Sequence, residues 1–202
     1  MNQIVFEDKN IIPNKVICVG RNYVEHIREL GNEIPENMVI FLKPNSSISE
    51  ELKYVSEDNH YEGEISFLIM QSKIAGVGFG LDLTKRELQS TLKNRGLPWE
   101  RAKCFDGAAV FSEFVSFSSS VEELMLELYI NDKLVQKGEV VHMMYKPKDI
   151  LKEIKSFMSF EDGDIIMSGT PKGVGKYQKG DKFVGKILHK NTLLIEHEWM
   201  VA

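Results

Sequence analysis

The fold is decided by the stretch His60-Tyr61-Glu62-Gly63-Glu64-Ile65-Ser66-Phe67-Leu68-Ile69-Met70. From Ile65 onward this stretch is apolar and β-prone, which predicts a strand that enters the core. Glu62 and Glu64 open the strand, and side chains two positions apart on a strand point to the same face. Two carboxylates side by side at the mouth of a buried strand repel each other unless a cation lies between them. A divalent metal ion is the simplest such cation, because hard cations prefer carboxylate oxygen; an edge strand with two solvated glutamates is the alternative.

The rest of the chain predicts a β-rich protein with few helices. Further apolar runs predict strands at residues 15–19, 39–42, 74–79, 125–130, 133–136, 164–167, 182–187 and 192–199. Helical spacing predicts helices at residues 22–30, 84–95 and 149–158. At the start of the second helix, Thr84 and Glu87 have the spacing of a capping box. Strands and helices do not alternate regularly, so we expect an α+β protein dominated by antiparallel or mixed sheet rather than a doubly wound fold.

Length and composition predict a soluble single domain. The 202 residues suit one domain, and the absence of repeats or Pro/Ser-rich linkers places it over residues 1–202. The net charge of -5, with scattered Lys and Arg, argues against nucleic-acid binding, and no apolar run has the length of a membrane span. The first residues do not have the pattern of a signal peptide, so we expect a cytoplasmic protein. Cys18 and Cys104 are predicted to be reduced thiols among apolar neighbours.

A possible general base lies on the first predicted helix. His26 and Glu29 are spaced i and i+3, so their side chains can touch on one face of a helix. A carboxylate beside an imidazole fixes the tautomer of the ring and raises its basicity. The alternative is a surface helix whose charged residues lie on its solvated face.

Two further segments could contribute to a site. Asp82 lies between a predicted strand and a predicted helix, where it is either a third carboxylate for an octahedral oxygen site or a helix N-terminal acid. His60 could join such a site but reads more simply as a flanking residue. The Gly-rich segment 168–175 matches neither a Walker A loop nor a dinucleotide fingerprint. Its hydroxyl and backbone N–H groups could hold a carboxylate, and a plain tight turn is the alternative.

Six segments, taken in order, resemble the fumarylacetoacetate hydrolase family, in particular its small acylpyruvase branch. They are Val19-Gly20-Arg21-Asn22-Tyr23 with His26, Phe41-Leu42-Lys43-Pro44, Glu62-Gly63-Glu64, Asp82 to Gln89, Ala102-Lys103-Cys104-Phe105-Asp106, and Ser168 to Gly175. Together they span the chain from about residue 15 to about residue 187. The resemblance implies a mixed β-sandwich roll with peripheral helices, commonly assembled as a homodimer.

The resemblance also implies roles for individual residues. The implied metal ligands, for Mg²⁺ or Mn²⁺ with Ca²⁺ as an alternative, are Glu62, Glu64 and Asp82. The implied catalytic residues are His26 and Glu29, which activate water from a lid helix, and Lys103 beside the metal and substrate. The implied substrate-binding residues are Arg21, Lys43, Gln89 and Thr170.

The activity implied is hydrolysis of the C–C bond of an acylpyruvate-type 1,3-diketo acid, which gives pyruvate and a carboxylic acid. The partner is then a small 2-oxo acid. Oxaloacetate decarboxylation or tautomerisation at the same metal site is the alternative, together with isomerisation of 2-hydroxyhepta-2,4-diene-1,7-dioate. A non-catalytic binding module that keeps the pocket is a third reading. The complete set of acids, dyad and lysine argues against the third reading.

Overall fold

A large mixed sheet forms the centre of the computed structural model, which describes residues 1–29, 31 and 33–202. Seven of its eight strands follow the order β4-β3-β14-β7-β8-β10-β5, and β11 pairs with β8. Their bounds are β3 Lys15–Gly20, β4 Val39–Pro44, β5 Ile48–Ser49, β7 Gly63–Met70, β8 Lys73–Asp82, β10 Ala109–Phe111, β11 Val115–Ser116 and β14 Ile165–Met167. Strand β14 runs parallel to β3 and antiparallel to β7, so the sheet is mixed, as the sequence predicts.

From Gly63 onward, the stretch quoted from the sequence forms the middle strand of this sheet. Strand β7 is buried over nearly its whole length and forms a hairpin with β8. In the register of the hairpin, Gly63 faces Leu81 and Glu64 faces Gly80. Glu62 and Glu64 therefore lie beside the end of β8, where Asp82 is the last residue.

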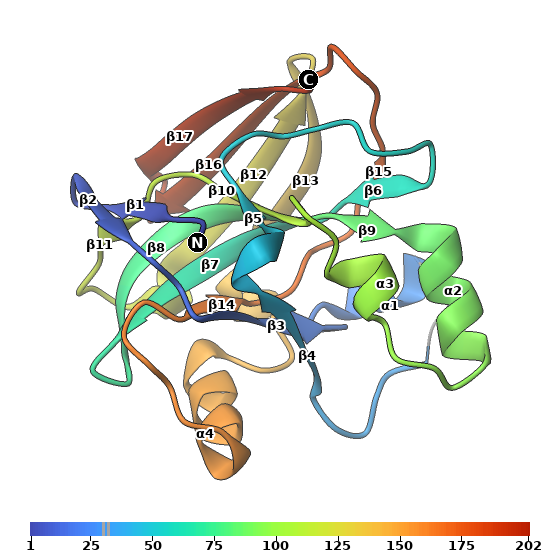
Figure 1. Cartoon of the computed structure of the whole chain (residues 1–202). Coiled ribbons are helices and arrows are strands. Elements are labelled where there is room, and N and C mark those ends of the chain that lie inside the picture. The colour runs from blue at the N-terminus through green and yellow to red at the C-terminus, as the bar shows by residue number, and fades with distance from the viewer. Residues whose placement is uncertain (30, 32) are drawn as a thin grey trace.

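A second sheet of four antiparallel strands packs on the large one (Figure 1). Its order is β13-β12-β16-β17, with bounds β12 Leu124–Ile130, β13 Lys133–Glu139, β16 Lys182–His189 and β17 Thr192–Met200. Phe79 from the large sheet packs in one hydrophobic cluster with Leu128 and Trp199 from the second sheet. That cluster includes residues from Ile17 to Val201, so a single core joins the two sheets.

The remaining strands form two small sheets. Strands β1 Ile4–Phe6 and β2 Lys9–Ile11 form a hairpin, and β15 Gly175–Lys176, β6 Asn59–Tyr61 and β9 Thr84–Lys85 form the other sheet. Short 3-10 helices occur at η1 Asn45–Ser47, η2 Val121–Glu123 and η3 Val140–His142.

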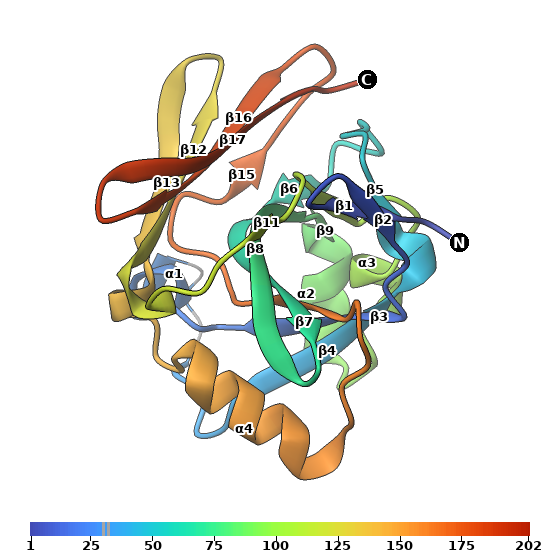
Figure 2. The same ribbon diagram turned by 90° about the vertical axis from the view of Figure 1, so that its left-hand side faces the viewer.

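The described residues form four α-helices, which lie around the sheets. Helices α1 Val24–Glu29, α2 Arg86–Asn94 and α3 Glu100–Lys103 gather near one end of the large sheet (Figure 1). Helix α4 Pro147–Phe157 lies on the far side of the large sheet from the four-stranded sheet (Figure 2). Leu30, at the end of the first predicted helix, lies outside the described residues. Within the described ranges, no helix is long and apolar enough to cross a membrane.

The predicted capping box at α2 is wrong. Thr84 lies in β9, where it is fully buried, and the helix begins two residues later at Arg86. The N-terminal amides of the helix are instead satisfied by Asp58, whose carboxylate accepts hydrogen bonds from the N–H groups of Glu87 (2.7 Å) and Leu88 (3.3 Å). The hydroxyl of Thr84 instead accepts a hydrogen bond from Lys103.

Two-residue turns connect the hairpins, and they account for most of the described non-glycine residues with left-handed backbone. Eight of the nine described non-glycine residues with positive φ form consecutive pairs at such turns: Glu7-Asp8, Gln71-Ser72, Asn131-Asp132 and Lys190-Asn191. Positive φ at both central residues is the geometry of a type I′ turn, which matches the twist of the flanking strands. The hairpin predicted around Asn131-Asp132 is therefore confirmed. Arg21 is the ninth residue, and it lies outside any hairpin turn.

Candidate metal centre and active site

The three predicted metal ligands lie together in the interior. Glu62 precedes β7, Glu64 is its second residue, and Asp82 ends β8. Each offers a carboxylate oxygen, and these oxygens lie within 4.8 Å of one another. Glu62 and Glu64 are 6% and 2% exposed, which rules out an edge strand with solvated glutamates. Asp82 belongs to a strand, so the interpretation as a helix N-terminal acid is wrong.

Three cationic side chains hold two of these carboxylates. Lys103 Nζ lies 2.8 Å from Glu62 Oε2 and 2.7 Å from Asp82 Oδ2. Arg86 donates to Glu62 Oε1. Lys43 Nζ lies 2.8 Å from Asp82 Oδ1 and donates hydrogen bonds to the backbone carbonyls of Lys103 and Ala108.

Glu64 differs from its neighbours because no cationic side chain of the described residues contacts it. Its Oε2 accepts a hydrogen bond from the backbone N–H of Gly169 at 2.7 Å. Burial raises the pKa of Glu64 well above its usual range, and the nearby charges of Asp82 and Glu62 raise it further. By contrast, burial would raise the pKa of Glu62, but Lys103 and Arg86 outweigh it and hold that pKa well below its usual range.

This imbalance fits a bound divalent cation. Three buried carboxylates with converging oxygens form a hard, all-oxygen donor set of the kind that Mg²⁺ and Mn²⁺ accept. Of the three carboxylates, Glu64 is the one whose pKa the described residues leave raised, and a cation among the three would stabilise its ionised form.

Lys103 is fixed beside the acid cluster. Its ammonium group also donates to Thr84 Oγ1 at 2.6 Å, so its three N–H bonds have three oxygen partners. Burial lowers the pKa of Lys103, but the charges of Asp82 and Glu62 outweigh burial and raise it overall. The side chain is therefore held as a cation, with its charge directed at two of the carboxylates.

The predicted dyad forms on helix α1. His26 Nδ1 lies 3.1 Å from Glu29 Oε2, and the ring of His26 is buried at 5% exposure, so the solvated-face alternative does not hold for this residue. Because Nδ1 is engaged by the carboxylate, Nε2 is the ring nitrogen able to exchange a proton with a ligand. His26 lines the same cavity as the three acids.

The Gly-rich segment 168–175 does hold carboxylates, and both belong to the chain itself. The N–H of Gly169 donates to Glu64, and the N–H of Gly173 donates to both carboxylate oxygens of Glu29, at 3.0 and 3.2 Å. Both glycines have positive φ, near 100°. A Cβ at Gly173 would lie 2.0 Å from the carbonyl oxygen of Val135, so no other residue fits there. One turn thus positions a candidate metal ligand and the residue that orients His26.

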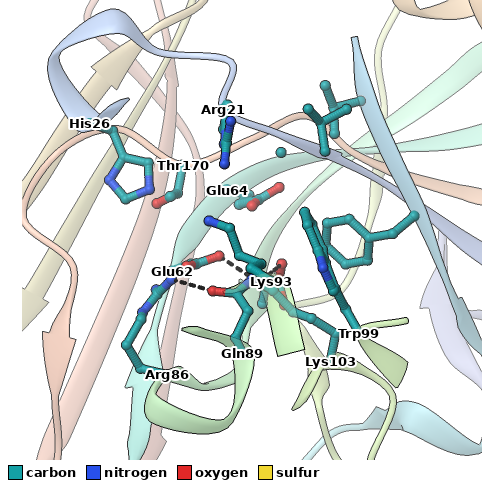
Figure 3. A pocket seen from close by; sticks show the side chains of 15 residues that line it. Arg21, His26, Glu62, Glu64, Arg86, Gln89, Lys93, Trp99, Lys103 and Thr170 are labelled. Atoms are coloured by element: carbon teal, nitrogen blue, oxygen red, sulfur yellow. Dashed lines mark hydrogen bonds and ion pairs between the residues drawn. The ribbon is translucent and has the colours of Figure 1, made fainter. Parts of the chain in front are cut away.

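The predicted substrate-binding residues divide into two groups. Arg21, Gln89 and Thr170 line the cavity together with His26 and the acids (Figure 3). Thr170 Oγ1 donates to the carbonyl of Gly63 at 2.9 Å, so its hydroxyl proton is already used. Lys43 does not line this cavity: it is fully buried and supports Asp82 from behind.

Other residues that the sequence reasoning did not select as site residues also line the cavity, and three of them carry charged or indole side chains. Arg86 and Lys93 come from helix α2, and Trp99 comes from the loop before α3 (Figure 3). Arg86, Gln89 and Lys93 are spaced i, i+3 and i+7, so they form one polar stripe on the helix. This spacing is visible in the sequence, but the helix is predicted from the leucines on its opposite face, and they give no reason to select the polar face. His60 lies in β6 and is not among the residues that line the cavity.

Comparison with known proteins places this arrangement in a family. Residues 15–194 match the family model described as fumarylacetoacetate (FAA) hydrolase C-terminal. The chain is 34% identical to an oxaloacetate tautomerase of Escherichia coli, over 84% of this chain and 86% of that protein. It is 36% identical to a mitochondrial oxaloacetate tautomerase of Oryza sativa subsp. japonica, over 93% of this chain and 90% of the other.

A solved relative carries ligands. The structure of a fumarylpyruvate hydrolase from Pseudomonas aeruginosa, in complex with Mn²⁺ and pyruvate, superposes with a TM-score of 0.87 at 26% identity. The superposition covers 100% of this chain and 95% of that one. The β-rich fold predicted from the sequence is thereby confirmed.

Proposed function

The chain belongs to the fumarylacetoacetate hydrolase family, and from that premise we propose that it is a metal-dependent enzyme that interconverts the keto and enol forms of a small 2-oxo acid, with oxaloacetate as the substrate. The sequence favours hydrolysis of an acylpyruvate and keeps oxaloacetate chemistry as the alternative. The similarity to two oxaloacetate tautomerases supports the alternative.

One observation carries the proposal: the acid cluster and His26, which is paired with Glu29, line the same cavity. Keto–enol interconversion moves one proton between C3 and the 2-oxygen of the substrate, so it needs a proton carrier beside a group that favours the enolate. A divalent cation held by Glu62, Glu64 and Asp82 would supply the latter as a Lewis acid.

The residues of the chain then have distinct roles in the proposed reaction. His26 takes the proton from C3 at Nε2, and Glu29 holds the ring in the required tautomer. Lys103 directs its positive charge toward the cluster where the enolate charge develops. Gln89 accepts a hydrogen bond from Arg86 at its Oε1, so its amide N–H groups are turned to other partners and suit a substrate carboxylate.

Acylpyruvate hydrolysis is a second candidate, favoured by the same His26–Glu29 pair. A histidine with a deprotonated Nε2 can activate a water molecule as readily as it can move a substrate proton. The similarity to a fumarylpyruvate hydrolase supports this candidate. The two reactions share every residue named above and differ in whether water attacks a second carbonyl.

Parallel assays distinguish the two candidates. The purified protein, loaded with Mg²⁺ or Mn²⁺, is mixed with the enol form of oxaloacetate, and the ultraviolet absorbance of the enol is followed; acetylpyruvate is tested in the same way. We expect loss of the enol well above the spontaneous rate, abolished by a chelator and restored by adding the metal.

If the enol of oxaloacetate disappears only at its spontaneous rate while acetylpyruvate is consumed rapidly, the tautomerase proposal is wrong and the protein is a hydrolase. Release of pyruvate from oxaloacetate in step with the loss of the enol would identify decarboxylation instead.

A further inference from the structure

The cavity lined by the acid cluster is small and has an apolar side. Its volume is about 50 Å³, which is space for about four water molecules, since one molecule needs about 10–15 Å³. The apolar residues among its described lining are Val19, Val39, Phe41 and Trp99, which come from β3, β4 and the loop before α3. Apart from Gly20, the other described lining residues carry charged or polar side chains. The carboxylate and oxo groups of a 2-oxo acid suit the charged side, so the carbon tail of the acid is left to contact the apolar side.

Three side chains form a continuous wall on the apolar side. The ammonium of Lys103 lies 5.1 Å from the centre of the Phe41 ring. The rings of Phe41 and Trp99 pack with their centres 6.0 Å apart and their planes inclined by 58°. Both kinds of contact favour a defined orientation of the rings. Phe41, Trp99 and Lys103 therefore form the wall of the cavity, and Figure 3 shows the indole of Trp99 among the side chains that line it.

The backbone places Trp99 in a fixed relation to the acid cluster. The carbonyl of Trp99 accepts hydrogen bonds from the N–H groups of Ala102 at 2.8 Å and Lys103 at 3.0 Å, which form the first turn of α3. The ammonium of Lys103 is held in turn by Glu62 and Asp82. One helical turn thus connects the indole to the carboxylates.

A larger apolar groove adjoins the cavity. It has a volume of about 410 Å³, and it shares Val39 and the three wall residues with the cavity. Its further lining includes the side chains of Met38, Ile40, Leu42, Leu97 and Pro98. Leu42 and Leu97 are exposed, so the groove opens to solvent. The wall therefore separates a small cavity from a space that would accept a long apolar chain.

We infer that Trp99 limits the length of the substrate: the wall admits 2-oxo acids with a short carbon tail, such as four-carbon acids, and closes the groove to longer tails. The inference deepens the proposed function and rests on it for the 2-oxo acid end of the ligand. It makes Trp99 a specificity-determining residue, because a small side chain in its place would join the cavity and the groove into one space. The same limit would apply to the acyl group in acylpyruvate hydrolysis.

A series of 2-oxo acids of increasing length tests the limit. 2-Oxobutanoate, 2-oxohexanoate and 2-oxooctanoate share one polar end and differ only in their number of CH₂ groups. Calorimetric titration of the Mn²⁺-loaded protein measures each affinity. In the wild type we expect the affinity to fall by about tenfold or more from the shortest acid to the longest, because an oversized group in a closed cavity is unfavourable. In Trp99→Ala the affinity should instead rise by about two- to fourfold for each CH₂ added, because the tail then lies in the groove.

Two further variants and a metal titration serve as controls. Trp99→Leu keeps an apolar side chain of intermediate size and should give an intermediate dependence on length. Leu97 lines the groove but not the cavity, so Leu97→Ala should keep the preference of the wild type for the short acid. In Trp99→Ala, the affinities for Mn²⁺ and for 2-oxobutanoate should change by less than about threefold, because the acid cluster is untouched, whereas a general structural defect would lower both.

The inference is overturned if the wild type binds the longest acid as tightly as the shortest, or if Trp99→Ala keeps the dependence on length seen in the wild type. A length limit that depends on Trp99, in a protein that does not act on oxaloacetate, would support the wall and reject the proposed function. Turnover of oxaloacetate by a protein that has no such limit would support the proposed function and overturn the inference.

Discussion

At the scale of single residues, Glu62 and Glu64 have the same chemistry and opposite electrostatic surroundings. Glu62 contacts Lys103 and Arg86, so Glu62→Gln removes an anionic partner from two cations, and we expect the free energy of unfolding to fall by about 3 kcal/mol. Glu64 contacts no cationic side chain among the described residues, so Glu64→Gln removes a repelled charge and should leave the metal-free protein as stable or more stable. Urea titration of the metal-free variants measures the difference; equal destabilisation by the two substitutions would contradict this account.

His26 provides the second prediction at this scale. His26→Ala removes the proposed proton carrier without touching the acid cluster, so turnover should fall by about 100-fold or more while Mn²⁺ affinity stays unchanged. Calorimetry gives the metal affinity, and the enol assay gives the rate. Full turnover in His26→Ala would remove this residue from the mechanism.

Which residues could be predicted from the sequence depends on how local their interactions are. The pairs Glu62/Glu64 and His26/Glu29 are visible because two or three positions separate their members, and the periodicity of a strand or helix then determines that they meet. Lys93 and Trp99 meet the acids only through the packing of α2 and the loop before α3 against the sheet. The spacing of residues in the sequence does not predict that packing.

At the scale of elements, helix α2 depends on a distant loop for its first turn. Asp58 accepts hydrogen bonds from Glu87 N and Leu88 N, so Asp58→Ala should cost about 1 kcal/mol of stability. Loss of these two hydrogen bonds should also raise KM for the substrate, because Arg86, Gln89 and Lys93 all lie on this helix.

Glu87→Ala is the matched control for Asp58→Ala. Glu87 belonged to the capping box expected from the sequence, but its side chain is exposed, with its ion-pair partner Lys176 3.8 Å away. We expect a change within about 0.5 kcal/mol. Thermal unfolding of the two variants shows which residue caps the helix. A larger loss of stability in Glu87→Ala than in Asp58→Ala would support the capping box.

Elements were predictable to the extent that their own sequence determines them. The strands and the Asn131-Asp132 hairpin follow from apolar runs and turn residues, and the structure has them close to the predicted positions. The start of α2 was misplaced because a cap supplied by Asp58, from a separate loop, leaves no local signal. The hydroxyl of Thr84, which has the local signal, bonds to Lys103.

At the scale of the whole molecule, metal binding should be coupled to folding. The three carboxylates come together only when β7 and β8 pair, so the unfolded chain offers no such cluster. A metal concentration 100 times Kd would add about 2.7 kcal/mol of stability, which corresponds to a rise in Tm of about 5–10 °C.

Scanning calorimetry with and without Mg²⁺ tests this coupling. The rise should vanish in Glu64→Gln, which retains the fold and lacks one ligand. An unchanged Tm in the wild type at saturating metal would show that the acid cluster does not take up the ion.

The division of the cavity between a central and a peripheral set of residues has an evolutionary consequence. The three acids lie on or beside the paired core strands β7 and β8, where a substitution disturbs the packing of both sheets. Arg21, Lys93 and Trp99 come instead from the segment after β3, from helix α2 and from the loop before α3. Gene duplicates could exchange these outer residues one at a time and acquire new substrates, while the inherited metal-binding chemistry passes unaltered from ancestor to descendant.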